Sequence, residues 1–167
     1  MADDTAQRGE SGARVTENPD PPLPDAVFSV VNPVMKHLLA SPLHGLLDDS
    51  LLTIEFTGRK SGATYRTPVG YTQFDDTLVV FTHSPWWHNF EDPQRVTVRL
   101  RGTRRAGTAT AYDDPEAVAE RVRRVIDAEG VEVASRVGLD IEGGIPDEET
   151  LAAAIDQTVA IEIALDD

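Results

Sequence analysis

Residues 51–83 read LLTIEFTGRKSGATYRTPVGYTQFDDTLVVFTH, and this stretch decides the fold class. Apolar and polar residues alternate along it with a period of two, which is typical of strands that have one buried face. The alternation is interrupted where glycine, serine and aspartate gather, as expected for turns. We therefore predict three consecutive strands, LLTIEFT (51–57), RTPVGYTQF (66–74) and TLVVFTH (77–83).

Three further strands are predicted downstream. RVTVRLRG (95–102) alternates apolar residues with threonine and arginine, RRAGTATAY (104–112) follows a turn near Gly102, and VAIEIAL (159–165) alternates again. Strands at a spacing of about 8–12 residues favour an antiparallel barrel over a parallel sheet. We therefore expect an α+β fold with a small barrel of about six mainly antiparallel strands and flanking helices.

Helices are predicted on both sides of the strands. Apolar residues three and four apart indicate two short helices over residues 27–40, separated at an Asn-Pro pair. Asp113 or Asp114 is the expected cap of a longer helix, and a last helix begins near Pro146. At 167 residues the chain suits one domain. We expect a disordered acidic leader over residues 1–23 and the folded domain over 24–167.

The charge balance limits the possible partners. The chain has 29 acidic and 15 basic residues and a formal net charge of −14, which argues against nucleic acid or an anionic membrane surface as the main partner. Arginine far outnumbers lysine, and the acidic residues are dispersed. This pattern predicts a halophilic protein from a salt-rich cytoplasm, while an acidic protein from an ordinary GC-rich bacterium is the alternative.

The same composition points to a cytoplasmic location. The chain contains no cysteine, so it has no disulfide framework and no zinc–thiolate site. No apolar run approaches the ~20 residues that span a bilayer, and the start lacks the pattern of a signal peptide. We expect no stable membrane insertion.

One strip of the sequence is basic. No acidic residue occurs from Phe56 to Phe74, and GRKSG (58–62) carries two cations, a serine and two glycines. Glycines at both ends of a turn let backbone N–H groups converge on an anion, and arginine and lysine bind phosphate. The alternative is an ordinary hairpin turn with surface cations. The spacing of a nucleotide-binding phosphate loop is missing.

A second acid-free window, residues 93–112, is rich in arginine. Its members are Arg95, Arg99, Arg101, Arg104 and Arg105. These arginines either extend the same anion site or pair with carboxylates on the helices, and the sequence leaves both possibilities open.

The third feature is SPWWHNFEDP (84–93), a short aromatic insert between strands. Adjacent tryptophans either line a planar pocket, with His88 and Asn89 as donors, or close the barrel with Trp87 in the core. If the insert is extended, the two tryptophans face opposite sides. His83 and His88 do not have a metal-ligand spacing, so we predict no metal site.

Taken together, FTGRKSGATYRTPVGY (56–71), PWWHNFEDP (85–93) and VTVRLRG (96–102) resemble the deazaflavin-dependent nitroreductase family. The resemblance implies a split, FMN-binding-like β-barrel that holds coenzyme F420 or, alternatively, FMN. It further implies a cofactor site that comprises Arg59, Lys60, Ser61, Gly62, Arg66, Thr67, Pro68, Trp87 and Asn89.

The implied activity is transfer of a hydride from F420H2 to a small, electron-poor acceptor, which is a quinone, an activated alkene or a nitro compound. Tyr71, Tyr65 and His88 are the candidate proton donors. The alternatives are an FMN-dependent reductase and a non-enzymatic carrier of FMN, haem or F420. Relatives of this kind are monomers or homodimers. The chain departs from nitro-reducing members because no aromatic residue follows Tyr112.

Overall fold

The computed structural model describes residues 12–18 and 51–167 of the chain. Its main element is a seven-stranded antiparallel sheet. In spatial order the strands are β3 (Thr64–Gly70), β2 (Leu51–Thr57), β6 (Gln94–Leu100), β7 (Thr103–Tyr112), β9 (Val159–Leu165), β5 (Thr77–Thr82) and β4 (Thr72–Phe74). The predicted α+β split barrel is therefore confirmed, while the two helices predicted over residues 27–40 lie outside the described residues.

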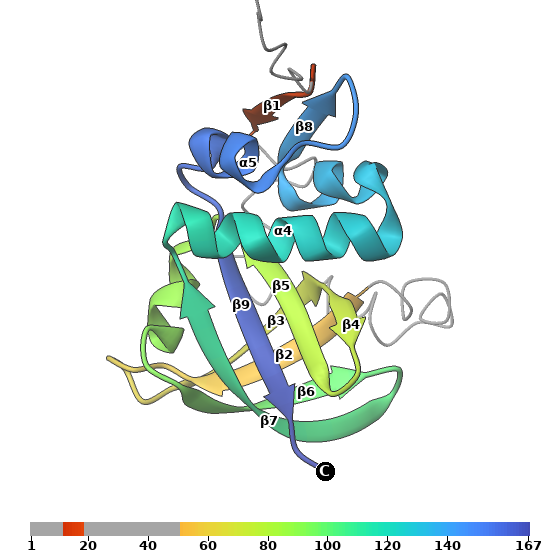
Figure 1. The fold of residues 1–167 in the computed structure, drawn as a ribbon. Coiled ribbons are helices and arrows are strands. Elements are labelled where there is room, and N and C mark those ends of the chain that lie inside the picture. The colour runs from red at the N-terminus through yellow and green to blue at the C-terminus, as the bar shows by residue number, and fades with distance from the viewer. Residues whose placement is uncertain (1–11, 19–50) are drawn as a thin grey trace, which may run out of the picture.

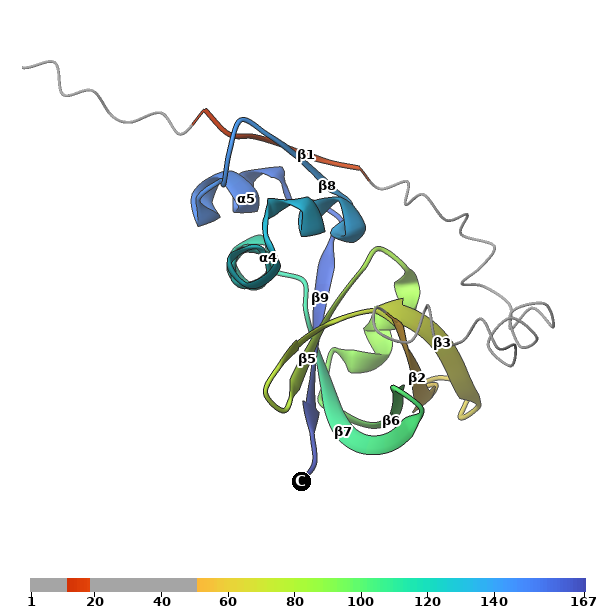
Figure 2. The same ribbon diagram turned by 90° about the vertical axis from the view of Figure 1, so that its right-hand side faces the viewer.

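The sheet curls because its two edge strands are consecutive in the chain. β3 ends at Gly70 and β4 begins at Thr72, so a single residue, Tyr71, connects opposite edges. A flat sheet of this size would separate its edges by about 29 Å, whereas two peptide units span only about 7 Å. The strands consequently wrap into the half-barrel that Figure 2 shows.

The connection at Tyr71 corrects one prediction. Residues 66–74 were predicted as a single strand, but they belong to two strands on opposite edges. Thr67, Val69 and Tyr71 alternate with less buried residues up to the break, but Thr72 is buried as well, so the alternation of burial stops at Tyr71. Because Thr72 is polar, the sequence alone gave little signal of this change.

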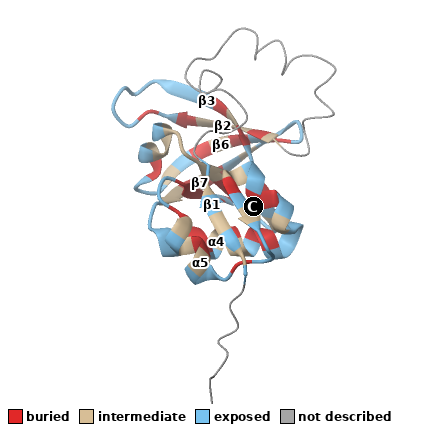
Figure 3. Cartoon of the chain, turned by 90° about the horizontal axis from the view of Figure 1, so that it is seen from above, coloured by how far each residue is buried: buried red, intermediate tan, exposed pale blue. Residues whose placement is uncertain are grey.

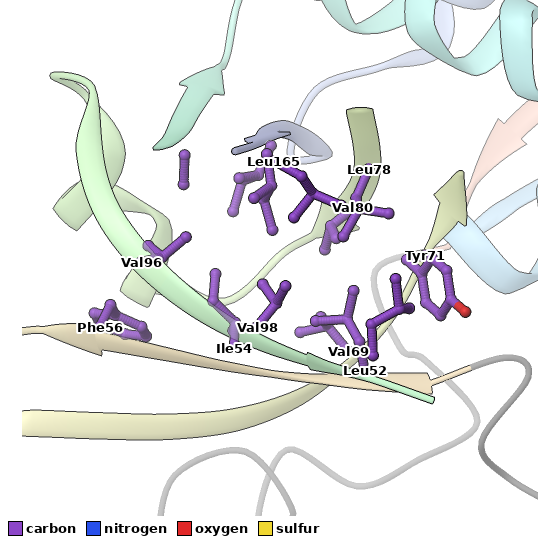
Figure 4. Packing of buried hydrophobic residues seen from close by; sticks show 14 of the residues in the cluster. Leu52, Ile54, Phe56, Val69, Tyr71, Leu78, Val80, Val96, Val98 and Leu165 are labelled. Carbon is purple, nitrogen blue, oxygen red and sulfur yellow. The ribbon is translucent and has the colours of Figure 1, made fainter. Parts of the chain in front are cut away.

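The barrel interior is one apolar cluster. Figure 4 shows side chains from β2, β3, β5 and β6 pointing toward one another, with Phe56 and Tyr71 at opposite ends of the cluster. Ile54, Leu78 and Val98 are among its most buried members. Burial of apolar surface stabilises the fold by ~25 cal/mol per Å², so this interior is the main source of the barrel's stability.

A helical layer covers β5 and β9 on their other face (Figure 1). It comprises α4 (Pro115–Glu129), the 3₁₀ helix η2 (Val131–Val137) and α5 (Glu148–Ala154). As predicted, α4 has an aspartate cap, because the Asp114 carboxylate accepts a hydrogen bond from the Ala117 N–H at 3.1 Å. Valines of α4 pack against Val79 and Ala160, which face away from the barrel interior. None of the helices in the described ranges has the length and apolar composition needed to cross a bilayer.

A second, two-stranded sheet lies at the outer side of this layer. β1 (Arg14–Glu17) pairs antiparallel with β8 (Leu139–Glu142). Neither strand was predicted, and β1 falls within residues 1–23, which were expected to be disordered. Four residues of alternating charge and polarity are too short a pattern to be distinguished from a polar tail.

Candidate cofactor-binding site

The basic strip forms the turn between β2 and β3. The Gly58 N–H donates to the Ala63 carbonyl at 2.8 Å, and the Gly62 N–H donates to the Gly58 carbonyl at 2.9 Å. Gly62 has a φ of 68°, in the left-handed region that favours glycine. A Cβ atom on Gly58 would lie 2.5 Å from the Tyr65 ring and 2.7 Å from Ser61 Oγ, so the turn requires both glycines.

The expected nest of converging N–H groups is largely used within the protein. Besides the two glycine N–H groups, the Arg59 N–H donates to Asn89 Oδ1 at 2.8 Å, and the Ala63 N–H donates to Ser61 Oγ at 3.2 Å. These four groups are therefore not free to bind an anion. The side chains of the turn remain as the principal donors for such a ligand.

Two of the predicted cations are paired with carboxylates. Arg59 Nη1 lies 2.7 Å from Glu91 Oε2, and Arg66 Nε lies 2.5 Å from Glu55 Oε2. Lys60, by contrast, is exposed and contacts no acidic side chain of the part of the chain that the structure describes. The strip is thus basic in sequence but partly neutralised in space, because Glu55 comes from the neighbouring strand and Glu91 from the aromatic insert.

The aromatic insert is a 3₁₀ helix, η1 (Pro85–Phe90), rather than an extended segment. Asn89 connects it to the turn, because the side chain accepts from the Arg59 N–H and its Nδ2 donates to the Trp86 carbonyl at 2.7 Å. η1 and the GRKSG turn are separate in sequence, yet this one side chain joins them. Asn89 is therefore a structural link of the site.

Glu91, directly after η1, contacts two cationic or ionisable side chains. His88 Nδ1 lies 2.6 Å from one carboxylate oxygen, and Arg59 donates to the other. Hydrogen bonds from His88 and then from Arg59 lower the pKa of Glu91 below its usual value of 4.5. The side chain is therefore a carboxylate at neutral pH.

The two tryptophans have different surroundings. Trp86 stacks on Phe56, with ring centroids 5.8 Å apart, and meets Phe90 edge to face. Trp87 stacks on His88 at 3.8 Å between centroids. Both are partly buried against the barrel core, and the insert is helical, so the extended conformation in which they would face opposite sides does not occur. In the helical conformation of η1, these two successive side chains do not point in opposite directions.

Sequence reasoning missed the aromatic stack at this end of the barrel. Tyr65 and Phe56 are cross-strand partners, with rings 5.7 Å apart, and Trp86 stacks on the same Phe56. Tyr65 is 45% exposed, and its hydroxyl lies 3.0 Å from Ser61 Oγ. The signal was present in the register of the hairpin, because a turn over residues 58–63 brings residues 56 and 65 opposite each other.

The candidate proton donors do not lie together. Tyr65 and His88 are exposed beside the turn and η1, whereas Tyr71 is buried at the far end of the cluster (Figure 4). Neither the Tyr71 hydroxyl nor Thr67 Oγ1, both buried, has a hydrogen-bond partner among the described residues.

The predicted binding residues on β3 also divide between two faces. Thr67 lies in the buried row with Val69, while Arg66 and Pro68 alternate with them on the opposite face. Figure 3 shows much of β3 in the colour of exposed residues. Arg66 and Pro68 therefore belong to the outer surface of the hairpin, which the period-two pattern did indicate.

Within the described residues, Arg95, Arg104 and Arg105 of the second arginine-rich window pair with carboxylates on strands and turns. Arg95 binds Asp166 beyond β9 at 2.5 Å, and Arg105 lies 3.6 Å from Asp76. Arg104 lies 3.3 Å from Glu55, the carboxylate that also binds Arg66. One member of the window thus joins the outer face of the hairpin.

The comparisons with known proteins agree with this arrangement of motifs. A model of the F420H(2)-dependent quinone reductases matches residues 39–139, which is more than half of the chain. The chain belongs to this family. Membership of the quinone reductase family confirms the resemblance to deazaflavin-dependent enzymes that the three sequence segments predicted. None of the curated proteins matches the sequence.

Several solved structures are similar to this quinone reductase family member. An FAD- and heme-binding protein from Mycobacterium smegmatis is 20% identical, with a TM-score of 0.43 over 74% of this chain and 65% of that one. HutZ, a heme storage protein from Vibrio cholerae, is 12% identical, with a TM-score of 0.42 over 82% and 91%. A protein described as an F420 reductase is 10% identical, with a TM-score of 0.38 over 76% and 95%. At these identities and scores, the likenesses do not assign a cofactor or an activity to this chain.

Proposed function

We propose that this protein is an F420H2-dependent reductase that uses the turn at residues 58–62 to bind the anionic part of its cofactor. The observation that carries the proposal is Lys60, an exposed cation without an acidic contact in the described part of a chain whose net charge is −14. Together with family membership, this local positive charge supports an anionic ligand at the turn rather than an ordinary surface hairpin.

The side chains of the turn fit a phosphate-bearing cofactor. Lys60 supplies a point charge, Ser61 a hydroxyl donor, and Arg59 a planar guanidinium. The carboxylates of Glu91 and Glu55 already satisfy part of this donor set, so Lys60 and Ser61 are the residues best able to make the first contact. An FMN phosphate has the same chemistry, and FMN therefore remains the alternative cofactor.

When bound, reduced F420 supplies a hydride to the acceptor. The residues of this chain bind and orient the cofactor and exclude water from the site. Phe56, Trp86 and Tyr65 form an apolar stack beside the turn that limits the access of water to this end of the barrel. We infer that Tyr65 holds the proton for the reduced acceptor at its Oη, because this hydroxyl is accessible and held by Ser61.

A quinone is the acceptor class that the family's description names, and we propose it as the substrate. Activated alkenes and nitro compounds are electron-poor acceptors of the same kind. Reduction of a quinone puts negative charge on its oxygens, and a neutral tyrosine hydroxyl is a suitable donor to them.

Reduced F420 mixed with the protein and menadione tests the proposal. We expect oxidation of F420H2 that requires both protein and quinone. Binding of F420 without turnover would indicate a carrier, and absence of binding would overturn the proposal. Lys60→Ala should weaken F420 affinity by roughly tenfold or more, because a charged phosphate contact is worth ~1.5–3 kcal/mol. Arg14→Ala removes an equal charge from exposed β1 and should leave the affinity unchanged.

A further inference from the structure

Glu91 contacts both Arg59 and His88 beside the GRKSG turn. Its two carboxylate oxygens accept from Arg59 and contact His88, at 2.7 and 2.6 Å. Both partners are half exposed, with 44% of the Arg59 side chain and 42% of the Glu91 side chain accessible. The pair is thus a surface ion pair beside the turn, and a solute can reach it.

This ion pair is not needed to hold η1 against the turn. Asn89 already makes that connection through its hydrogen bonds to the Arg59 N–H and the Trp86 carbonyl. Phe90, which is fully buried, anchors the other side of η1 in the barrel core. Loss of the carboxylate therefore leaves the backbone of the site in place.

We propose that Glu91 is an internal counter-ion, which neutralises Arg59 in the free protein and leaves it when the anionic cofactor binds. The identity of the ligand rests on the proposed function, whereas the role of Glu91 does not. A phosphate carries more charge than one carboxylate and makes paired hydrogen bonds to a guanidinium. It therefore competes with Glu91 for Arg59, and Glu91 sets how tightly and how selectively the site binds anions.

The chain offers a matched control next to Glu91. Asp92 is the following residue, is exposed, and has no ion pair within the described residues. Asp92→Asn and Glu91→Gln each remove one negative charge from the same surface. Only Glu91→Gln frees Arg59, so a difference between the variants reports the counter-ion and not the overall charge.

Titration of F420 into the two variants and the wild-type protein, followed by calorimetry, tests the proposal. We expect Glu91→Gln to bind F420 more tightly by on the order of fivefold, the upper range for release of a surface pair. Asp92→Asn should differ little from wild type. Equal or weaker binding by Glu91→Gln would overturn the proposal, because Glu91 would then position Arg59 instead of competing for it.

A second titration separates this proposal from the cofactor assignment. Inorganic pyrophosphate is the probe, and the Arg59 side-chain N–H signals in NMR spectra are the readout. If no form of the protein binds F420, the proposed function fails, but tighter pyrophosphate binding by Glu91→Gln still supports the counter-ion. Equal pyrophosphate affinity, or no shift of the Arg59 signals in either form, would overturn it. Glu91→Ala repeats the comparison without a hydrogen-bonding amide, and should give the same gain.

Discussion

Glu17 and Thr158 are 141 positions apart in the sequence, and the Glu17 carboxylate accepts hydrogen bonds from both the backbone N–H and the hydroxyl of Thr158, at 2.6 and 2.5 Å. The N–H groups of Asp156 and Gln157 donate to the same carboxylate. Thr158 Oγ1 also lies 3.0 Å from His83 Nε2 at the end of β5, just before η1. β1 is therefore fixed to the body of the domain by one buried anion.

We expect Glu17→Gln to lower the free energy of unfolding by about 2 kcal/mol, because hydrogen bonds to a charged group are worth ~1.5–3 kcal/mol and the amide keeps only one acceptor. Chemical denaturation measures the change. Asp140→Asn, an exposed site on β8, is the control and should change stability by less than ~0.5 kcal/mol. Equal stability of both variants would contradict the role given to Glu17.

The same carboxylate should make stability depend on pH. Burial raises the pKa of Glu17, but hydrogen bonds from the Thr158 hydroxyl and three backbone N–H groups outweigh it, and the pKa is lowered from 4.5. A depressed pKa stabilises the fold above the unfolded value, and this contribution is lost as the pH falls through the folded pKa. As the pH is lowered from ~6 to ~3, the free energy of unfolding should therefore decrease more steeply for wild type than for Glu17→Gln. Parallel curves would exclude Glu17 as the titrating group.

Tyr65→Phe should reduce quinone reduction on the order of 10²-fold or more, the usual contribution of a positioned proton donor. Cofactor affinity should change little, because the ring and its stack on Phe56 remain. Stopped-flow oxidation of F420H2 by menadione measures the rate. Tyr71→Phe is the matched control, since that hydroxyl is buried at the other end of the barrel. A larger effect at Tyr71 would transfer the role to that residue.

Trp87 should report cofactor binding through its fluorescence. It stacks on His88, beside the Arg59–Glu91 pair, whereas Trp86 packs between Phe56 and Phe90. We expect Trp87→Phe to remove most of the quenching that F420 causes, and Trp86→Phe to preserve it. The reverse result would place the cofactor ring over the aromatic stack at Phe56. If F420 quenches the fluorescence of none of these proteins, neither tryptophan lies near the cofactor.

Salt should stabilise the protein. With 29 acidic against 15 basic residues, repulsion among carboxylates opposes folding, and at 1 M salt the screening length is only ~3 Å. We expect the melting temperature to rise between low and molar KCl, as proposed for a protein from a salt-rich cytoplasm. A flat or falling melting temperature would favour the ordinary acidic protein instead.

The sequence predicted the elements of the barrel well, and most clearly β2 and β6, which each have one buried row that alternates with a more exposed one. It did not predict the split of residues 66–74, because the residue at which the alternation of burial stops, Thr72, is polar in sequence although it is buried. It also did not predict β1, whose stability comes from pairing with β8 and from Glu17, and not from local propensity.

The candidate site was predicted only in part. A segment with no acidic residue identified the turn, and the adjacent tryptophans identified the aromatic insert, but a linear charge pattern does not show cross-strand neighbours. Glu55 precedes the acid-free strip by one position and faces Arg66 across the hairpin, and Glu91 reaches Arg59 from η1. Which cations pair with which carboxylates therefore depends on the residues that face each other in the folded protein. The composition of a segment does not specify these neighbours.

The curled sheet has a further consequence for self-association. In the described part of the chain the incomplete barrel has two edge strands, β3 and β4, and regular edges recruit strands from other molecules into aggregates. Here β4 is only three residues long, and β3 carries Pro68, which has no N–H to donate, next to the charged Arg66. Both edges thus have features that resist intermolecular strand addition, and the barrel can stay open without becoming a template for fibrils.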